Sequence, residues 1–187
     1  VPVFTVAYMK PHSSQRLVSL GWVEGWDDAL SRFLIAFGSD QPPQLVHDVS
    51  VDGMPFLWRA ATRKELRESV VLRPGDSRFH FQVMRRYQGM CCLCDFGVPE
   101  MLVPVHLRPK EEGGSDDPRN GVLLCPLHSA SFKQSFIAIE PETLKVHSIA
   151  MGPSLEDLKI TKDSLSAISL KPHQAALRWH WNKWSLA

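Results

Sequence analysis

Two short motifs, each bringing two potential metal ligands together, constrain the fold of this chain more than any other feature. The first is Cys91-Cys92-Leu93-Cys94, and the second is Cys125-Pro126-Leu127-His128. Two intervening residues allow one tight turn to direct both ligands at the same ion, and two such turns supply the four tetrahedral ligands that zinc prefers. The sequence therefore predicts a structural Zn²⁺ ion. Its expected ligands are Cys91, Cys94, Cys125 and His128.

The cysteines also bear on the compartment, and they allow a simpler interpretation. Two disulfides would suit a secreted protein, but the adjacent Cys91 and Cys92 fit that arrangement poorly, and the chain shows no basic-then-apolar signal segment at its start. We therefore expect an intracellular protein of the cytoplasm, nucleoid or nucleus. The alternative to zinc is that reduced cysteines pack as small apolar side chains. Cys92 is expected to be a thiol of the core or of the surface instead of a ligand.

Composition limits the class of partner. The chain has 187 residues, of which 44% are hydrophobic, so a core can form. The formal net charge is only +1, and a face that binds nucleic acid would have to be local. No apolar run approaches the roughly 18 residues of a membrane span, so we expect no membrane association.

Local patterns predict an α+β fold with a mixed N-terminal region over residues 1–77. A strand is expected over 3–8 and a hairpin over 49–59, around the turn pair Asp52-Gly53. Apolar residues fall on one helical face over 26–37, which predicts a helix. A capping box at 62–65 predicts another helix that extends to about residue 70.

The Pro-Gly pair within 73–76 marks the expected boundary with a second region over residues 78–187. Here the patterns predict a helix over 79–87, a hairpin over 136–146 and a C-terminal helix over 173–184. The tryptophans of that last helix are expected to cap a core rather than to stack on bases. Six histidines have no partner at ligand spacing and are interpreted as ordinary: His12, His47, His80, His147, His173 and His180.

The order of parts over residues 79–146 resembles the HNH family of nucleases, whose core is a ββα-metal unit. A helix with Arg and Tyr leads into the first Cys pair, and His106-Leu107-Arg108-Pro109 follows at a strand end. A glycine-containing charged loop then leads to Asn120-Gly121-Val122-Leu123-Leu124 and the second Cys/His pair. The fold class that this resemblance implies is a zinc-knuckle ββα-metal core joined to the N-terminal mixed region and the C-terminal helix.

The resemblance implies a metal-dependent DNA endonuclease that hydrolyses phosphodiester bonds. His106 would match the general base, and Asn120 would orient the imidazole or the loop that carries it. A catalytic Mg²⁺ or Mn²⁺ would neutralise charge on the phosphate. Basic residues would contact the DNA backbone without reading bases. These residues are Arg85, Arg86, Arg108 and Lys110.

The sequence also departs from the HNH pattern. Zinc-bearing relatives commonly have a second histidine where Ser129 stands, and many have an aspartate at the positions of Val105 or Lys133. A hydroxyl is a poor metal ligand and an ammonium repels a cation, so the catalytic metal site is rearranged or lost. Ser129 and Lys133 are expected in the neighbourhood of a catalytic metal or of a DNA phosphate. Some relatives carry the metal histidine one residue earlier, which would assign His128 to catalysis instead of zinc.

Two further hypotheses stay open. The first is a catalytically degenerate HNH-fold zinc module that binds DNA or a protein partner. The second is a structural zinc domain whose function lies at the 26–37 surface. In the nuclease interpretation the N-terminal region is expected to choose the target or the partner.

Overall fold

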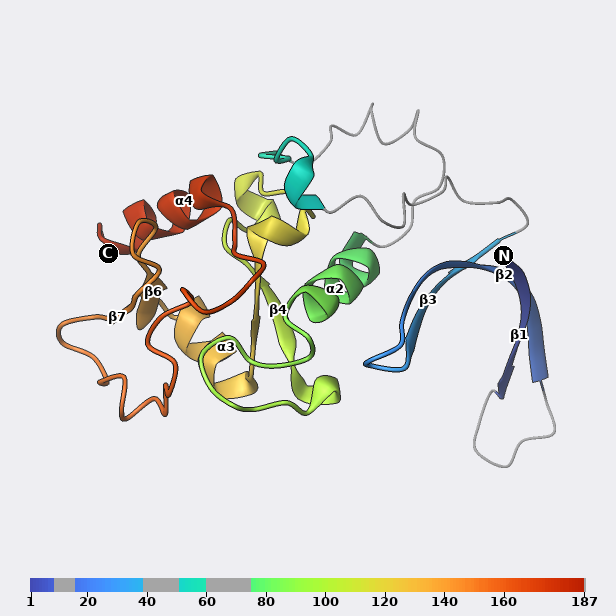
Figure 1. Cartoon of the computed structure of the whole chain (residues 1–187), viewed down its shortest axis with the longest axis horizontal. Helices are drawn as coiled ribbons and strands as arrows, with labels where there is room; N and C mark the ends of the chain where they lie inside the picture. Colours follow the sequence, from blue (N-terminus) through green and yellow to red (C-terminus); the bar gives the residue numbers. More distant parts are fainter. Residues whose placement is uncertain (9–15, 39–50, 60–74, 187) are drawn as a thin grey trace. The chain divides into compact units, whose positions relative to one another are not determined.

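The computed structural model describes residues 1–8, 16–38, 51–59 and 75–186 (Figure 1). These residues belong to two compact units, of which the first takes residues 1–8 and 16–38 and the second takes 51–59 and 75–186. The helix predicted from the capping box at 62–65 lies outside the described residues.

The first unit contains a three-stranded antiparallel sheet in the order β1-β2-β3. Its strands are β1 (Pro2–Tyr8), β2 (Arg16–Asp27) and β3 (Arg32–Phe37). Residues of β1 pair with β2 along the whole strand, from Pro2 opposite Trp22 to Tyr8 opposite Arg16. The predicted strand over 3–8 is therefore confirmed.

The predicted helix over 26–37 is wrong, because these residues form the end of β2, a turn and β3. Trp26 pairs with Phe33 across the hairpin, and the Asp27 carboxylate accepts a hydrogen bond of 3.1 Å from the Leu30 amide in the turn. The turn closes at Ser31, which has a φ of 50°. The aromatic residues of this segment favour strands, and pairing with a long neighbouring strand outweighed the helical spacing of the apolar positions.

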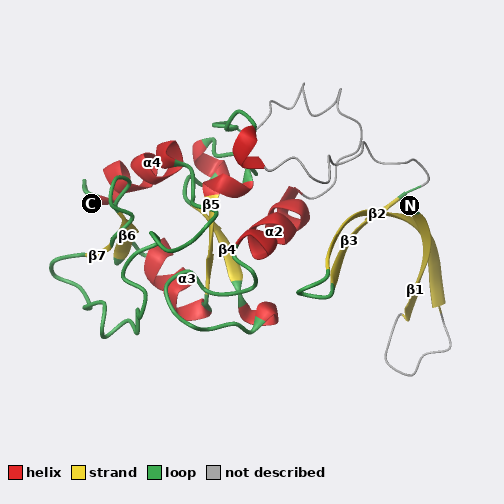
Figure 2. Cartoon of the chain, viewed as in Figure 1, coloured by secondary structure: helices red, strands yellow, loops and turns green. Residues whose placement is uncertain are grey.

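The second unit contains three helices and two small antiparallel sheets among its described residues (Figure 2). The helices are α2 (Gly75–Arg86), α3 (Pro126–Lys133) and α4 (Gln174–Trp184). The sheets pair β4 (Val103–His106) with β5 (Gly121–Leu124) and β6 (Ile137–Ile139) with β7 (Val146–Ser148). Short 3₁₀ turns occupy Val51–Gly53, Pro99–Met101, Lys110–Glu112 and Pro118–Asn120. The predicted C-terminal helix is confirmed. The helix predicted over 79–87 is present but begins earlier, at Gly75, and the hairpin predicted over 136–146 is present with its second strand at Val146–Ser148.

The described part of the predicted 49–59 hairpin has a different structure, a 3₁₀ turn followed by a segment without strand pairing. A buried ion pair from the loop before β5 satisfies its backbone groups. Arg119 donates to the carbonyls of Met54 and Pro55 at 2.8 and 3.0 Å, and Asp117 accepts from the Leu57 amide at 3.1 Å. The Asp117 and Arg119 side chains thus make the backbone hydrogen bonds that a second strand of the predicted hairpin would otherwise have made.

The core of the second unit lies around β5, where Val122, Leu123 and Leu124 are completely buried. Helix α2 packs so closely on this strand that a Cβ at Gly121 would lie 2.6 Å from the Phe79 ring. Asn120-Gly121 is not a left-handed turn, because Gly121 has an extended φ of −128°. The glycine is needed here to admit α2, not for a positive φ.

Within the described residues, no helix combines the length and the apolar character needed to cross a membrane.

Candidate metal centre and His106 pocket

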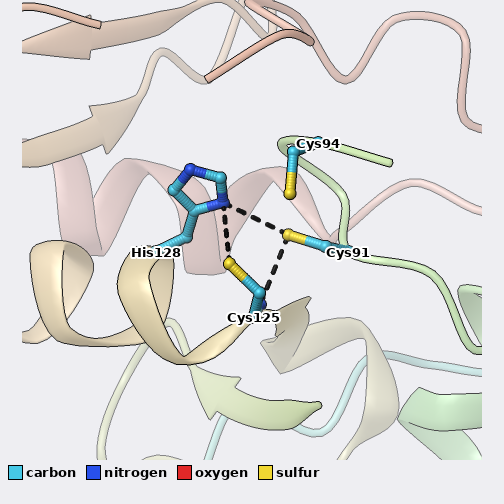
Figure 3. A group of neighbouring side chains, drawn as sticks. All are labelled: Cys91, Cys94, Cys125 and His128. Atoms are coloured by element: carbon cyan, nitrogen blue, oxygen red, sulfur yellow. Dashed lines mark hydrogen bonds between the residues drawn. The ribbon is translucent and has the colours of Figure 1, made fainter. Parts of the chain in front are cut away.

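The four predicted zinc ligands come together in one cluster. Their ligand atoms all lie within 4.8 Å of one another (Figure 3). Cys91 and Cys94 stand in the turn that follows α2, Cys125 caps the N-terminus of α3, and His128 lies in the first turn of that helix. Elsewhere among the described residues, no other group of three or more His, Cys, Asp or Glu is placed to hold a metal ion.

His128 Nδ1 faces the sulfur atoms, 3.4 Å from Cys91 Sγ and 3.3 Å from Cys125 Sγ. The other ring nitrogen, Nε2, lies 2.9 Å from the Leu158 carbonyl oxygen. A carbonyl at this position fixes the ring and its tautomer, as in histidines that ligate metals. Three sulfurs and one nitrogen are a donor set compatible with tetrahedral zinc.

The surroundings shift the pKa of Cys91, a member of the cluster, and the pKa of the neighbouring Cys92 in opposite directions. Burial disfavours the Cys91 thiolate, but hydrogen bonds from His128 and from backbone groups outweigh it and lower the pKa of Cys91 to about 7. Cys92 is only 3% exposed, and burial raises the pKa of its thiol well above the usual range. Of the core and surface positions expected for Cys92, the structure therefore has the core position.

The β4–β5 hairpin separates the cluster from His106. His106 pairs with Gly121 at one end of the hairpin, and Val103 pairs with Leu124 at the other, next to Cys125. Three strand residues span about 10 Å. Because His128 contacts the thiols at the far end, its side chain is not available beside His106.

His106 ends β4 with a side chain that is 18% exposed. Its Nε2 lies 3.1 Å from Asp116 Oδ1, and its ring stacks on Phe79 at a centroid distance of 3.8 Å. An ionised carboxylate only accepts hydrogen bonds, so Nε2 carries the proton and Nδ1 is the basic nitrogen. Sequence reasoning missed Asp116, although a carboxylate in the loop after a candidate base was a usable signal.

Asp116 is itself held by a second partner, because Lys110 Nζ lies 3.0 Å from the same carboxylate oxygen. Burial opposes ionisation of Asp116, but the hydrogen bonds from His106 and Lys110 prevail and lower its pKa. The carboxylate is therefore ionised at neutral pH and orients the imidazole.

Asn120 stabilises the loop that contains Lys110 and Asp116 through three side-chain hydrogen bonds. Its Nδ2 donates to the carbonyls of Arg108 and Ser115 at 3.0 and 2.9 Å, and its Oδ1 accepts from the Arg108 amide at 3.0 Å. The side chain is almost completely buried. Of the two roles considered for Asn120, these contacts fit holding the loop rather than contacting the imidazole.

A pocket of about 440 Å³ lies beside His106. Strand β4 and the loop after it form one wall, and the end of α3 and one side of α4 form the others. Its charged lining side chains are Lys110, Glu111, Lys133 and Lys183. Ser129 is not among the lining residues, because it is buried in α3 with only 4% exposure.

The predicted DNA-contacting residues differ in what they touch. Arg85 is exposed, but Arg86 is buried and makes a two-pronged ion pair with Asp52 at 2.6 and 3.0 Å. The Arg86 guanidinium therefore binds the 51–59 segment through Asp52 and is not available to contact a DNA phosphate. The Arg108 guanidinium lies 4.6 Å from the Trp58 ring centroid and donates to the Glu112 carbonyl, so it is largely engaged within the fold.

The residues around His106 fit a catalytic Mg²⁺ or Mn²⁺ poorly. These ions need several oxygen ligands, usually carboxylates. Here the nearest carboxylate, Asp116, already contacts His106 and Lys110, and three lysines line the pocket. The donor set supports a cation at the cysteine cluster and not at this pocket.

His180 also lines the pocket, stacked on Phe132 at 4.1 Å. Burial and the nearby Lys183 lower its pKa to about 4. A depressed pKa contributes stability that is complete above the unfolded value near 6.5 and is lost as pH falls towards 4. We expect the unfolding free energy to drop by about 2 kcal/mol between pH 7 and pH 5 through this group.

Urea unfolding of the wild type and of His180→Phe at both pH values measures this effect. The difference between pH 7 and pH 5 should shrink in the variant, while protonation of the cysteine cluster affects both proteins alike. An equal pH dependence in the two proteins would contradict the buried neutral state of His180.

These features define a zinc-compatible β-hairpin and helix domain with a histidine and carboxylate pair beside a basic pocket. Residues 91–140 match the family model described as HNH endonuclease, and this match places the segment in the HNH nuclease family. The matched segment contains the whole cysteine cluster, His106 and Asn120. A search of curated proteins finds no match to the chain.

Proposed function

We propose that this protein is an HNH-type endonuclease that hydrolyses phosphodiester bonds of DNA. The observation that carries the proposal is the hydrogen bond between His106 and Asp116 at the edge of a basic pocket. The match of residues 91–140 to HNH endonucleases supports it. In this proposal β4, β5 and α3 form the ββα-metal unit, and the cysteine cluster holds structural zinc.

His106 acts as the general base. Nδ1 takes a proton from a water molecule, the water oxygen attacks phosphorus, and the bond from phosphorus to the leaving sugar oxygen breaks. The leaving oxygen takes its proton from solvent. Asp116 stabilises the imidazolium that forms, and Asn120 keeps the loop carrying Asp116 in place through its contact with Ser115. General bases of this kind contribute about 10²–10⁴ to the rate.

Nicking of supercoiled plasmid DNA by the zinc-loaded chain tests the proposal. We expect conversion to the open circular form. The assay is run with and without added Mg²⁺ or Mn²⁺, because the residues around His106 fit such a cation poorly. Intact plasmid under all of these conditions would contradict the proposed hydrolysis.

The second candidate is a non-catalytic HNH-fold module that binds the DNA backbone. One specific observation favours it, namely that Lys110, Lys133 and Lys183 line the pocket where a catalytic cation would be needed. Retained DNA affinity without nicking would select this candidate.

We further propose that the division into an N-terminal recognition region, 1–77, and a nuclease region, 78–187, holds with two adjustments, because residues 51–59 and 75–77 both belong to the second unit. The segment 51–59 packs with the second unit and stabilises the loop before β5 through Asp117 and Arg119. Choice of the DNA target or of a protein partner is assigned to the remaining N-terminal residues.

A further inference from the structure

We propose that the pocket beside His106 holds a DNA backbone phosphate through the Lys133 ammonium, so that phosphate binding there requires no divalent cation. This inference rests on the proposed function and specifies which group in the same pocket compensates the negative charge of the DNA phosphate. It departs from the metal-dependent site that the resemblance to HNH nucleases implies.

The first support is the state of the three pocket lysines. Lys110 is paired with Asp116 at 3.0 Å, and Lys183 is paired with Glu112. Lys133 is exposed, and its ammonium makes no hydrogen bond or ion pair with another described residue. Lys133 is thus the pocket lysine whose charge is left for a ligand from outside.

The second support is the way the fold positions Lys133. It is the last residue of α3, and the turn after it is tied to α4 by a 2.8 Å hydrogen bond from Trp184 Nε1 to the Ser135 carbonyl. The preceding Phe132 is buried and stacks on His180. The backbone on both sides of Lys133 is therefore anchored, and its side chain lines the same pocket as His106.

The third support is the charge balance of the pocket. Lys110 and Lys183 each pair with a carboxylate, so the charges of the lining that no described residue compensates are Lys133 and Glu111, which is exposed. The Lys133 ammonium would repel a divalent cation in this pocket, whereas a phosphate oxygen gains a charge-assisted hydrogen bond from it. The favoured occupant is an anion.

Fluorescence anisotropy with a labelled DNA duplex tests the inference on the full, zinc-loaded chain. The buffer is freed of divalent cations with a chelating resin, and zinc content is checked afterwards so that the cysteine cluster stays loaded. We expect tight binding that added Mg²⁺ leaves nearly unchanged. Lys133→Ala should weaken binding about tenfold and lower the slope of log affinity against log salt by about one.

Lys145→Ala is the matched control, because Lys145 is an exposed lysine outside the pocket and its loss changes the net charge equally. It should bind DNA like the wild type. Lys133→Asp tests directly whether the Lys133 ammonium takes the place of a divalent cation. The DNA affinity of this variant should be low without Mg²⁺ and should recover when Mg²⁺ is added.

The outcomes separate this inference from the proposed function. Wild-type binding that requires Mg²⁺, or unchanged affinity in Lys133→Ala, would overturn the role of Lys133 even if plasmid nicking that depends on His106 is observed. Mg²⁺-independent binding that Lys133→Ala weakens would support it even if no nicking occurs, and only the hydrolysis proposal would then fail.

Discussion

Replacing Cys125 by serine is expected to release the zinc ion and to unfold the second unit. Cys125 directly follows β5, is the N-cap residue of α3 and has its sulfur 3.3 Å from His128 Nδ1. Its loss therefore removes one of the four expected ligands at the junction of strand and helix. Structural zinc contributes about 10 kcal/mol or more to small domains, which is as large as the whole stability of a typical protein. Elemental analysis and thermal unfolding followed by circular dichroism measure the two effects.

Cys92→Ala provides the matched control for Cys125→Ser. Cys92 is also buried and lies in the same turn as Cys91, but it is not a member of the ligand cluster. The control should keep one zinc per chain and should lose only the small packing contribution of a thiol. If both variants retained zinc and melted alike, the cluster would not be the element that holds this domain together.

Replacing His106 by alanine is expected to abolish DNA nicking, with a rate at least about 10²-fold below the wild type. The imidazole is the side chain that Asp116 orients at the pocket, and alanine offers no group to take the proton from water. Loss of the stack on Phe79 will lower stability as well, so a melting curve must show that the variant is folded at the assay temperature. The assay is conversion of supercoiled to open circular plasmid.

His147→Ala controls for the general effect of removing a histidine. His147 lies on β7, outside the residues that line the pocket, and its side chain is 42% exposed. It should nick DNA at the wild-type rate. Equal nicking by His106→Ala and the wild type would remove His106 from the mechanism, whatever the behaviour of the control.

The parts of the structure that local sequence encodes were predictable. The four candidate metal ligands follow from the spacing within two tight turns, which brings each pair together almost independently of the rest of the chain. Helices α2 and α4 and the β6–β7 hairpin were predicted because their apolar periodicity agrees with their final packing. Asn120 was a candidate for holding its loop because an amide can both donate and accept along a loop, and its hydrogen bonds to the Arg108 and Ser115 carbonyls fit this prediction.

The parts that depend on distant partners were not predictable. Residues 26–37 have helical spacing, but their pairing with β2 is a long-range interaction that a local pattern does not contain. Arg86 looked like a surface cation, and only the folded structure reveals its ion pair with Asp52, 34 residues away. The contact of Asp116 with His106 depends on the path of a loop that Asn120 closes.

The central claim is that one zinc ion joins the two turns through three sulfurs and the His128 nitrogen. X-ray absorption at the zinc edge measures this most directly on the purified chain. We expect one zinc per chain with three sulfur ligands near 2.3 Å and one nitrogen near 2.0 Å. A chain without zinc, or a zinc shell made of nitrogen and oxygen without sulfur, would contradict the account.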